Sequence, residues 1–257
     1  MVEITSDLLI LQNRDINFLD MHHHSTASDG TMSAKTLARI FKKKKLGLCI
    51  TDHNQIKGSV YLAKKTNIFT IPSIEVTTKE SNDVLVYFYD VSDLESFWEN
   101  EIRYEIRNNK GLNLNKTQIS VFDLPEKVKE YNGLSFLAHP IMPKVFGIFQ
   151  NPKDSSYLVE NKQFRKKIDG FESHNFSTNF SDESVAKLRK YNMPLIGGSD
   201  SHIVSLFNIL TGSETFERSD FLDNLLKKKN VIFFQKGNNM RRFIEQATIM
   251  KNNINFK

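Results

Sequence analysis

The sequence places Asp20-Met-His-His-His-Ser-Thr-Ala-Ser-Asp29-Gly30 directly after a short apolar run, Ile16 to Leu19. The apolar run predicts a strand, so the polar cluster should lie where that strand ends. Side chains alternate between the two faces of an extended segment. His22 and His24 should therefore point the same way, and His23 the opposite way. Two imidazoles on one side, with the carboxylate of Asp29 five residues beyond, predict the start of a metal site.

The remaining histidines also lie where predicted strands end. Each lies at or just past the C-terminal end of a predicted strand: His53 follows Leu48 to Asp52, His139 follows Leu134 to Ala138, His174 follows Ile168 to Ser173, and His202 follows Leu195 to Asp200. In parallel α/β barrels these strand ends gather on one face, where active sites are built. A surface accident, or the remnant of a tag at a terminus, would not produce this placement.

Carboxylates join the histidines at the strand ends. Glu75 ends the predicted strand over 69–76, Asp200 precedes His202 by two residues, and Asp52 directly precedes His53. A buried acid is costly unless it is paired or binds a metal, and mixed imidazole and carboxylate ligands suit zinc, manganese or iron. The candidate metal ligands are His22, His24, Asp29, His53, Glu75, His139, His174, Asp200 and His202.

Nine candidates are too many for one ion, so the sequence predicts two or three divalent metal ions. Clustered ions are typical of phosphate-ester hydrolysis, because they lower the pKa of bound water, hold the phosphoryl oxygens and offset the charge on the leaving oxygen. A single-metal site for amide hydrolysis or deamination would need fewer ligands.

Strand and helix patterns alternate along the chain and predict a parallel α/β architecture. Seven or eight strands favour a closed or nearly closed barrel over an open doubly wound sheet. We expect one domain over 1–257, interrupted by a helical excursion at about 92–131 that could cap the site. Strands are predicted at 16–21, 46–51, 67–76, 83–89, 134–138, 168–173, 194–198 and 230–235, and helices at 33–45, 94–109 and 182–191.

Composition narrows the class of protein only slightly. The chain has 257 residues, a formal net charge of +5 and a single cysteine, Cys49. Lysine runs at 42–45 and 227–229 carry much of the excess charge and most often form solvated helix faces. One cysteine excludes an intramolecular disulfide, and no apolar stretch is long enough for a membrane span. We therefore expect a cytoplasmic protein with no membrane partner.

The ordered motifs resemble the PHP (polymerase and histidinol phosphatase) superfamily. The resemblance covers about Phe18 to Ser205 and implies a distorted (β/α)7 TIM-like barrel, with a dinuclear or trinuclear site of zinc, manganese or iron and phosphoesterase activity. The motifs in order are Asp-x-His-x-His from Asp20, Ser28-Asp-Gly, Thr51-Asp-His, a Glu that ends a strand after Ile71-Pro, Ala138-His-Pro and Gly198-Ser-Asp-x-His.

The resemblance also implies roles for the individual side chains. His22, His24, Glu75 and Asp200 would hold the first metal ion, with Glu75 bridging to a second ion that His139 also binds. Asp29, His53 and His202 would hold a third. Asp20 and Asp52 would accept hydrogen bonds from ligand imidazoles and fix their tautomers.

Two departures from the family pattern concern the second metal and the substrate. Many members carry a further histidine near the end of the strand that follows the Glu, whereas Val84 to Tyr89 contains none. His174 could supply that ligand or contact the substrate. Members that act on nucleotides often have an arginine two residues after the Pro of Ala-His-Pro, where this chain has Met142. Lys144 could bind the phosphate instead.

The sequence thus predicts a metal-dependent phosphoesterase that hydrolyses small phosphomonoesters, such as a nucleotide, sugar or histidinol phosphate, by metal-activated hydroxide. Glu75, His174 and His202 are the catalytic candidates. One alternative is a 5′-3′ exonuclease or phosphodiesterase, for which Phe97, Trp98 and Tyr104 could stack bases. Another is a catalytically inactive, metal-stabilised structural module. The sequence does not indicate the oligomeric state.

Overall fold

The structure is a computed structural model that describes residues 2–13, 15–108, 115–141, 154–175, 182–203 and 209–235. Within these residues the longer strands form two five-stranded sheets. The first sheet has the order β1 (Glu3–Thr5), β12 (Val231–Phe234), β11 (Ile209–Ser213), β2 (Asn17–Asp20) and β3 (Gly47–Leu48). The second has the order β10 (Leu195–Gly197), β9 (Gly170–His174), β8 (Gly133–Leu137), β5 (Asp83–Phe88) and β4 (Ser73–Thr77).

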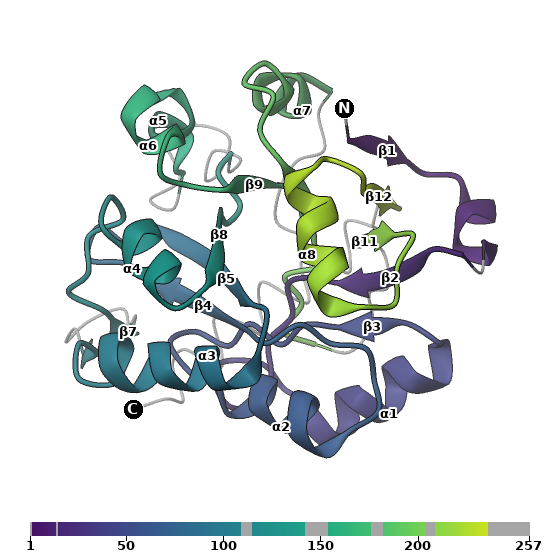
Figure 1. The fold of residues 1–257 in the computed structure, drawn as a ribbon, viewed down its shortest axis with the longest axis horizontal. Helices are drawn as coiled ribbons and strands as arrows, with labels where there is room; N and C mark the ends of the chain where they lie inside the picture. Colours follow the sequence, from purple (N-terminus) through teal and green to yellow (C-terminus); the bar gives the residue numbers. More distant parts are fainter. Residues whose placement is uncertain are drawn as a thin grey trace.

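Helices surround the two sheets, with α8 drawn in front of β11 and β12 in Figure 1. The described helices are the 3-10 helix η1 (Leu8–Gln12), α1 (Ala34–Lys44), α2 (Lys57–Lys65), α3 (Val91–Phe97), the π-helix η2 (Trp98–Ile102), α4 (Leu124–Glu130), α5 (Ser156–Glu160), α6 (Lys162–Arg165), α7 (Asp182–Arg189) and α8 (Arg218–Leu226). None of the helices in the described part of the chain has the length and apolar character needed to cross a membrane.

The predicted closed barrel is wrong for the described residues, because the strands belong to two separate sheets. Backbone pairing joins the sheets at two isolated parallel bridges, His23 to Ser201 and His53 to Glu75. Both bridges lie just past the ends of β2, β3 and β10, where the strands converge. The sheets therefore meet at the level of the predicted site.

The predicted parallel α/β architecture holds only in part. β4 and β5 pair antiparallel, as do β5 and β8, and β11 runs antiparallel to both β2 and β12. Only Thr78 to Asn82 separates β4 from β5, which is too short for a crossover helix but suits a hairpin. Ser81 adopts a left-handed backbone, with φ of 72°, in this turn. β5 consequently begins, rather than ends, beside the C-terminal part of β4.

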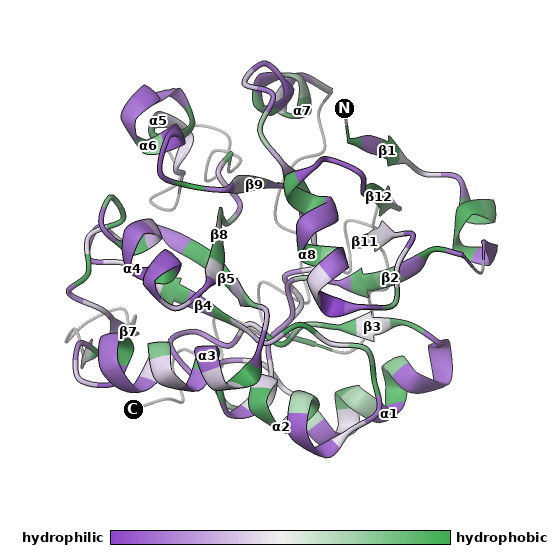
Figure 2. Ribbon diagram, in the orientation of Figure 1, coloured by the Kyte–Doolittle hydropathy of each residue, from purple (hydrophilic) through white to green (hydrophobic). Residues whose placement is uncertain are grey.

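Local sequence signals account well for α1, the predicted helix over 33–45. The Ser33 side chain accepts a hydrogen bond from the Thr36 N–H at 3.2 Å and caps the N-terminus. Lys45 ends the helix in a left-handed conformation. Leu37, Ala38 and Phe41 are buried on its inner face, and α1, α3, α4 and α8 show green and purple residues side by side in Figure 2, as expected for amphipathic helices.

The excursion at 92–131 is built from α3, η2, a two-stranded antiparallel ribbon of β6 (Arg107–Asn108) and β7 (Asn115–Lys116), and α4. The helical part ends at Ile102 rather than at Asn109 as predicted. Two contacts tie the excursion to the sheets: the indole N–H of Trp98 donates to the Asn54 carbonyl at 3.0 Å, and the Thr117 N–H donates to the Thr77 carbonyl at 3.0 Å. Both acceptors lie within two residues of a predicted metal ligand, so the excursion is anchored beside the site.

Candidate metal centre

The candidate ligands converge because several strands end at the same level. His22 and His24 follow β2, His53 follows β3, Glu75 lies within β4, and His139 follows β8. Asp200 and His202 follow β10, where Gly198 permits a close approach: a Cβ atom on this residue would lie 2.4 Å from the Cβ of His22. A side chain at position 198 would therefore push the segment carrying Asp200 away from His22.

Four of these side chains form a first group with a regular spacing. The Nε2 atoms of His22 and His24 lie 3.1 Å apart. Oε2 of Glu75 lies 3.4 Å from the first and 3.3 Å from the second, and Oδ1 of Asp200 lies 3.3 Å and 3.2 Å from them. A tetrahedral metal ion with bonds of about 2.0–2.1 Å has ligand-to-ligand distances of about 3.3–3.4 Å. The five distances match the edges of such a tetrahedron.

The hydrogen bond of His22 shows which of its nitrogens faces the other ligand atoms. His22 Nδ1 lies 2.9 Å from the carboxylate Oε1 of Glu172, which can only accept, so Nδ1 carries a proton and Nε2 is the nitrogen that would bind a metal ion once His22 is neutral. The lone pair of Nε2 then faces the oxygens of Glu75 and Asp200. Acceptors at this spacing repel each other unless a proton or a metal ion lies between them.

Glu75 contacts ligands on both sides of its carboxylate. Oε2 belongs to the first group, while Oε1 lies 3.4 Å from Nε2 of His139. The residue is fully buried, and neither oxygen has a hydrogen-bond donor with suitable geometry. Because a buried carboxylate without hydrogen bonds is costly, this arrangement fits a carboxylate that bridges two metal ions.

A third group lies at the half-buried side of the site. It contains His24, Asp29, His53 and His202, each of which offers an atom within 4.8 Å of the others. Oδ2 of Asp29 lies 3.2 Å from Nε2 of His202, whose Nδ1 donates to the Asp200 carbonyl at 3.1 Å. Nε2 of His202 is thus the nitrogen that faces Asp29 and that would bind a metal ion. His53 also approaches Glu75 at 3.2 Å through Nδ1 and so lies between two groups.

Asp83 completes a cluster that sequence reasoning missed. Its Oδ2 lies 3.6 Å from Nε2 of His139, and Asp83, His53 and Glu75 form a further group of potential ligands. The family pattern places a ligand near the end of the strand that follows Glu75. Because β5 is antiparallel to β4, the start of that strand lies at the site instead, and the five-residue gap between the two strands was the signal for it.

The electrostatics favour the ligand forms of Glu75 and His24 but not that of His22. Burial would raise the pKa of Glu75, but His53 and His22 hold it well below its usual value. Burial and the neighbouring His202 lower the pKa of His24 to about 4, which keeps its imidazole neutral. For His22, burial lowers the pKa but Asp200, Glu172 and Glu75 raise it overall. Glu75 is thus ionised and His24 is neutral, and metal binding would displace the proton that His22 otherwise retains.

The structure gives Asp20 and Asp52 partners other than the predicted ones. Asp20 pairs with the imidazole of His23 at 3.1 Å and accepts hydrogen bonds from Ser199, so it supports the segment beneath the ligands. Asp52 accepts from Ser25 and Ser28 and contacts no imidazole. Neither accepts from a ligand imidazole; Glu172 takes that role for His22. Glu172 lies two residues before His174 on a predicted strand. This spacing could have identified it as a residue that accepts a hydrogen bond from a ligand imidazole.

His174 lies apart from the three groups of potential ligands found among the described residues. It ends β9, where its Nδ1 lies 2.9 Å from the Ser173 hydroxyl and its ring packs against Phe234 at 4.9 Å. Burial lowers its pKa to about 4. Lys144 lies outside the described residues.

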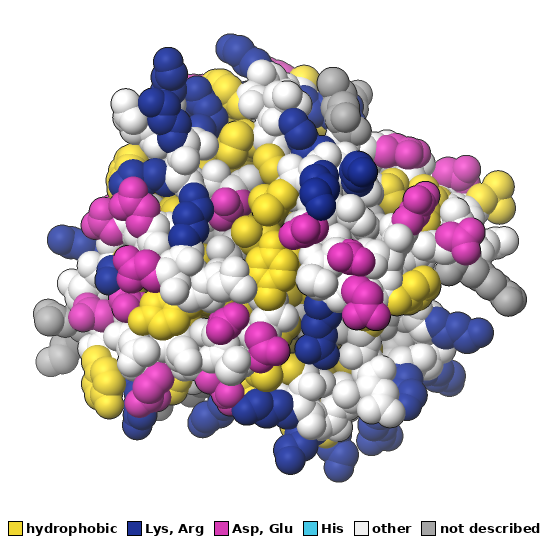
Figure 3. All heavy atoms as spheres, viewed as in Figure 1, with side chains coloured by type: hydrophobic (Ala, Val, Ile, Leu, Met, Phe, Trp, Pro, Cys, Tyr) yellow, Lys and Arg dark blue, Asp and Glu magenta, His cyan; other side chains and the backbone are white. Residues whose placement is uncertain are grey.

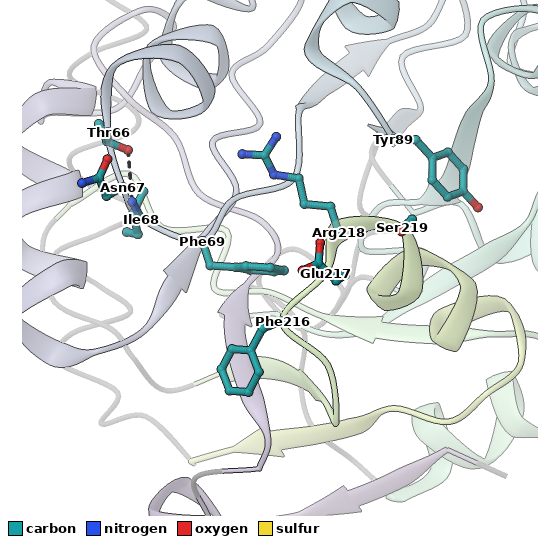
Figure 4. Close-up of a pocket in the computed structure, with 9 residues that line it drawn as sticks. All are labelled: Thr66, Asn67, Ile68, Phe69, Tyr89, Phe216, Glu217, Arg218 and Ser219. Carbon is teal, nitrogen blue, oxygen red and sulfur yellow. Dashed lines mark hydrogen bonds between the residues drawn. The ribbon is translucent and has the colours of Figure 1, made fainter.

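A separate cavity of about 550 Å³ lies away from the candidate ligands (Figure 4). It is bordered by Tyr89, just past the end of β5, whereas Asp83 begins that strand; six residues of extended chain place the two about 20 Å apart. No predicted site residue lines it. Its lining residues are Thr66, Asn67, Ile68, Phe69, Tyr89, Phe216, Glu217, Arg218 and Ser219.

No protein-family model matches the chain, and no curated protein is similar to it in sequence. Solved structures do match. A candidate metal-dependent phosphoesterase from Bifidobacterium adolescentis superimposes over 82% of this chain and 96% of its own, with a TM-score of 0.55 and 17% identity. A two-domain protein from Bacteroides vulgatus, which contains a predicted PHP-like metal-dependent phosphoesterase, superimposes over 90% of this chain and 69% of its own, with a TM-score of 0.60 and 15% identity.

The chain has a PHP-like fold. Endonuclease Q, solved with a 27-mer duplex containing an abasic lesion, shares it with a TM-score of 0.59 and 19% identity, over 77% of this chain and 52% of that chain. The shared fold agrees with the resemblance drawn from the ordered motifs, although the described strands do not close into a barrel.

Proposed function

We propose that this protein is a metal-dependent phosphoesterase that acts on small phosphomonoesters. The observation that carries the proposal is the first group: Nε2 of His22 and His24 and the oxygens of Glu75 and Asp200 have the spacing of a tetrahedral metal site, five of their six mutual distances being 3.1–3.4 Å. The proteins that share the fold include metal-dependent phosphoesterases and an endonuclease, all of which hydrolyse ester bonds.

Two or three divalent ions would be held by the first group, by Glu75 with His139, and by Asp29 with His53 and His202. Bound there, such ions supply Lewis acidity for a phosphoryl group and a water of lowered pKa. Glu75 would contribute one oxygen to the first position and the other to the second. His202, whose Nδ1 is held by the Asp200 carbonyl, would offer Nε2 to the third.

Small substrates are favoured over nucleic acid by the aromatic residues of the excursion. Phe97 is fully buried in the core, and Trp98 is held by its hydrogen bond to Asn54. Neither is thus free to stack on a base. Acidic and basic side chains are interspersed on the one face shown in Figure 3, which therefore offers no single-sign groove for a nucleic-acid strand.

A nuclease is the second candidate, and one observation favours it. Tyr104 is 76% exposed, and the guanidinium of Arg103 lies 5.5 Å from the centre of its ring. A stacked aromatic ring and cation on the excursion anchored beside the site could hold one nucleotide of a strand. Endonuclease Q shares the fold.

The test is phosphate release from nucleotides, sugar phosphates, histidinol phosphate and 5′-phosphorylated oligonucleotides, with zinc, manganese or iron supplied in turn. We expect hydrolysis of one or a few small monoesters, abolished in Glu75→Gln together with a loss of bound metal. Glu160→Gln, at the exposed end of α5, is the matched control and should behave as wild type. Cleavage of oligonucleotides alone would favour the nuclease, and a folded protein that binds no metal would refute both.

A further inference from the structure

We propose that Asp83 is a ligand of the second metal ion, together with His139 and Oε1 of Glu75. The inference rests on the proposed function, because it assigns a residue to the same metal centre. It also gives that position its own chemistry: two carboxylates and one imidazole, whereas the first group combines two carboxylates with two imidazoles.

Strand direction places Asp83 in the site. β5 pairs antiparallel with β4, with Asp83 opposite Thr77 and Leu85 opposite Glu75. Residues 83, 85 and 87 share one face of the strand, and Tyr87 shows that this face points inward, since its hydroxyl donates to the Met21 carbonyl at 2.8 Å. The first residue of β5 thus enters the cluster from the side of Glu75.

The distances support a shared ion. Nε2 of His139 lies 3.4 Å from Oε1 of Glu75 and 3.6 Å from Oδ2 of Asp83. The three residues are at most 4% exposed. A carboxylate oxygen of Asp83 lies within 4.8 Å of one of Glu75. Two buried carboxylates at this separation repel each other strongly unless a cation lies between them.

Leu85 shows that β5 offers no other ligand on this face near Glu75. It is the direct partner of Glu75 in the sheet, and it is fully buried in an apolar cluster with Leu19 and Met21. Asp83, two residues earlier on the same face, is the residue of β5 whose side chain can coordinate an ion beside His139.

An oxygen-rich ligand set also predicts metal preference. Carboxylates suit manganese better than zinc, whereas paired imidazoles at tetrahedral spacing suit zinc. We therefore expect the second position to take Mn²⁺ more readily than the first does.

The experiment measures metal content and affinity rather than turnover. Metal-free wild type, Asp83→Asn and Asp169→Asn are titrated with Mn²⁺ and with Zn²⁺, and bound metal is counted by equilibrium dialysis and atomic emission, with free Mn²⁺ followed by electron paramagnetic resonance. Asp169 is the control because its partly buried carboxylate accepts hydrogen bonds from Ser135, on the neighbouring strand, and belongs to none of the ligand groups.

We expect Asp83→Asn to lose one equivalent of Mn²⁺, or to bind it about 10- to 100-fold more weakly, while the remaining sites stay filled. Asp169→Asn should keep the wild-type stoichiometry. Unchanged stoichiometry and affinity in folded Asp83→Asn would overturn the assignment and leave the proposed function standing. A wild-type protein that binds no ion would overturn both.

Asp83→His provides a second test, should Asp83→Asn fail to fold. It restores a donor atom but replaces a carboxylate with an imidazole. We expect it to bind the second ion with its preference shifted from Mn²⁺ toward Zn²⁺ by at least about tenfold. An Asp83→His protein with the wild-type preference between the two metals would show that residue 83 does not contact the ion.

Discussion

At the scale of single residues, Glu172 fixes two candidate ligands with one carboxylate. Its Oε1 accepts from Nδ1 of His22 at 2.9 Å, and its Oε2 accepts from the backbone N–H of His139 at 2.8 Å. His139 adopts a left-handed backbone with φ of 30°, a conformation that costs free energy and persists only where its surroundings enforce it. Glu172 therefore orients ligands of the first and second positions at once.

Glu172→Gln tests this positioning role. The amide keeps the shape but offers one acceptor instead of two, so either His22 or the His139 N–H loses its partner. We expect metal affinity to fall about 10- to 100-fold, measured by competition with a chromophoric chelator, while circular dichroism shows a folded protein.

Asn175→Ala is the matched control, since it removes the hydrogen bond that the Asn175 amide donates to Oε2 of Glu172 at 2.9 Å but leaves the Glu172 carboxylate in place. Its metal affinity should stay close to that of wild type. Equal losses of affinity in the two variants would mean that the local packing, rather than the orientation of His22 and His139, depends on Glu172.

The sequence predicted part of this arrangement at the residue scale. Alternation along 20–24 placed His22 and His24 together and His23 opposite, and this is confirmed: the two Nε2 atoms lie 3.1 Å apart, whereas His23 pairs with Asp20 and packs edge-on against Phe41. Alternation works because it is a local property of one strand. The contacts of Glu172 depend on which strand lies beside β9, and the sequence does not state that.

At the scale of elements, the hairpin between β4 and β5 decides what reaches the second position. Its turn is closed by the Thr78 N–H, which donates to the Asn82 carbonyl at 2.9 Å, and it contains Ser81 in a left-handed conformation. The register of the turn sets Asp83 opposite Thr77. A shift by one residue would turn Asp83 to the other face of the sheet.

Replacing Ser81 tests the stability of this turn. Glycine adopts the left-handed region without steric cost, so Ser81→Gly should raise the free energy of unfolding by up to about 1 kcal/mol. Ser81→Val places a β-branched side chain there and should lower it by about 1–2 kcal/mol. Urea unfolding gives both values, and a Val variant as stable as wild type would contradict the left-handed turn.

Strand direction is also where prediction from sequence failed. The apolar runs gave the positions of β2, β5, β8, β9, β10 and β12 to within a few residues, because burial on both faces leaves an apolar signature. The apolar runs did not predict β11, because Ile209 to Ser213 form a short run that is half polar. The apolar runs also did not predict the antiparallel pairings, because these depend on loop length more than on the sequences of the strands.

At the scale of the whole molecule, the candidate ligands come from both sheets. His22, His24 and His53 follow strands of the first sheet, whereas Glu75, His139 and Asp200 lie on or follow strands of the second. Among the described residues, backbone pairing joins the sheets only at the bridges of His23 with Ser201 and His53 with Glu75. An ion shared by both sets of ligands would link the two sheets where their backbones barely pair.

Metal removal should therefore destabilise the whole fold rather than a local loop. At a metal concentration about 100 times the Kd, binding adds about 2.7 kcal/mol to the free energy of unfolding, which corresponds to roughly 5–10 °C in Tm for a chain of this size. Calorimetry of protein stripped with a chelator, before and after metal is restored, measures the difference. Glu75→Gln removes the carboxylate that lies between ligands from the two sheets. The Tm of this variant should rise much less than that of the wild type when metal is added. A Tm that is the same with and without metal in the wild type would mean that the ions, if bound, do not hold the sheets together.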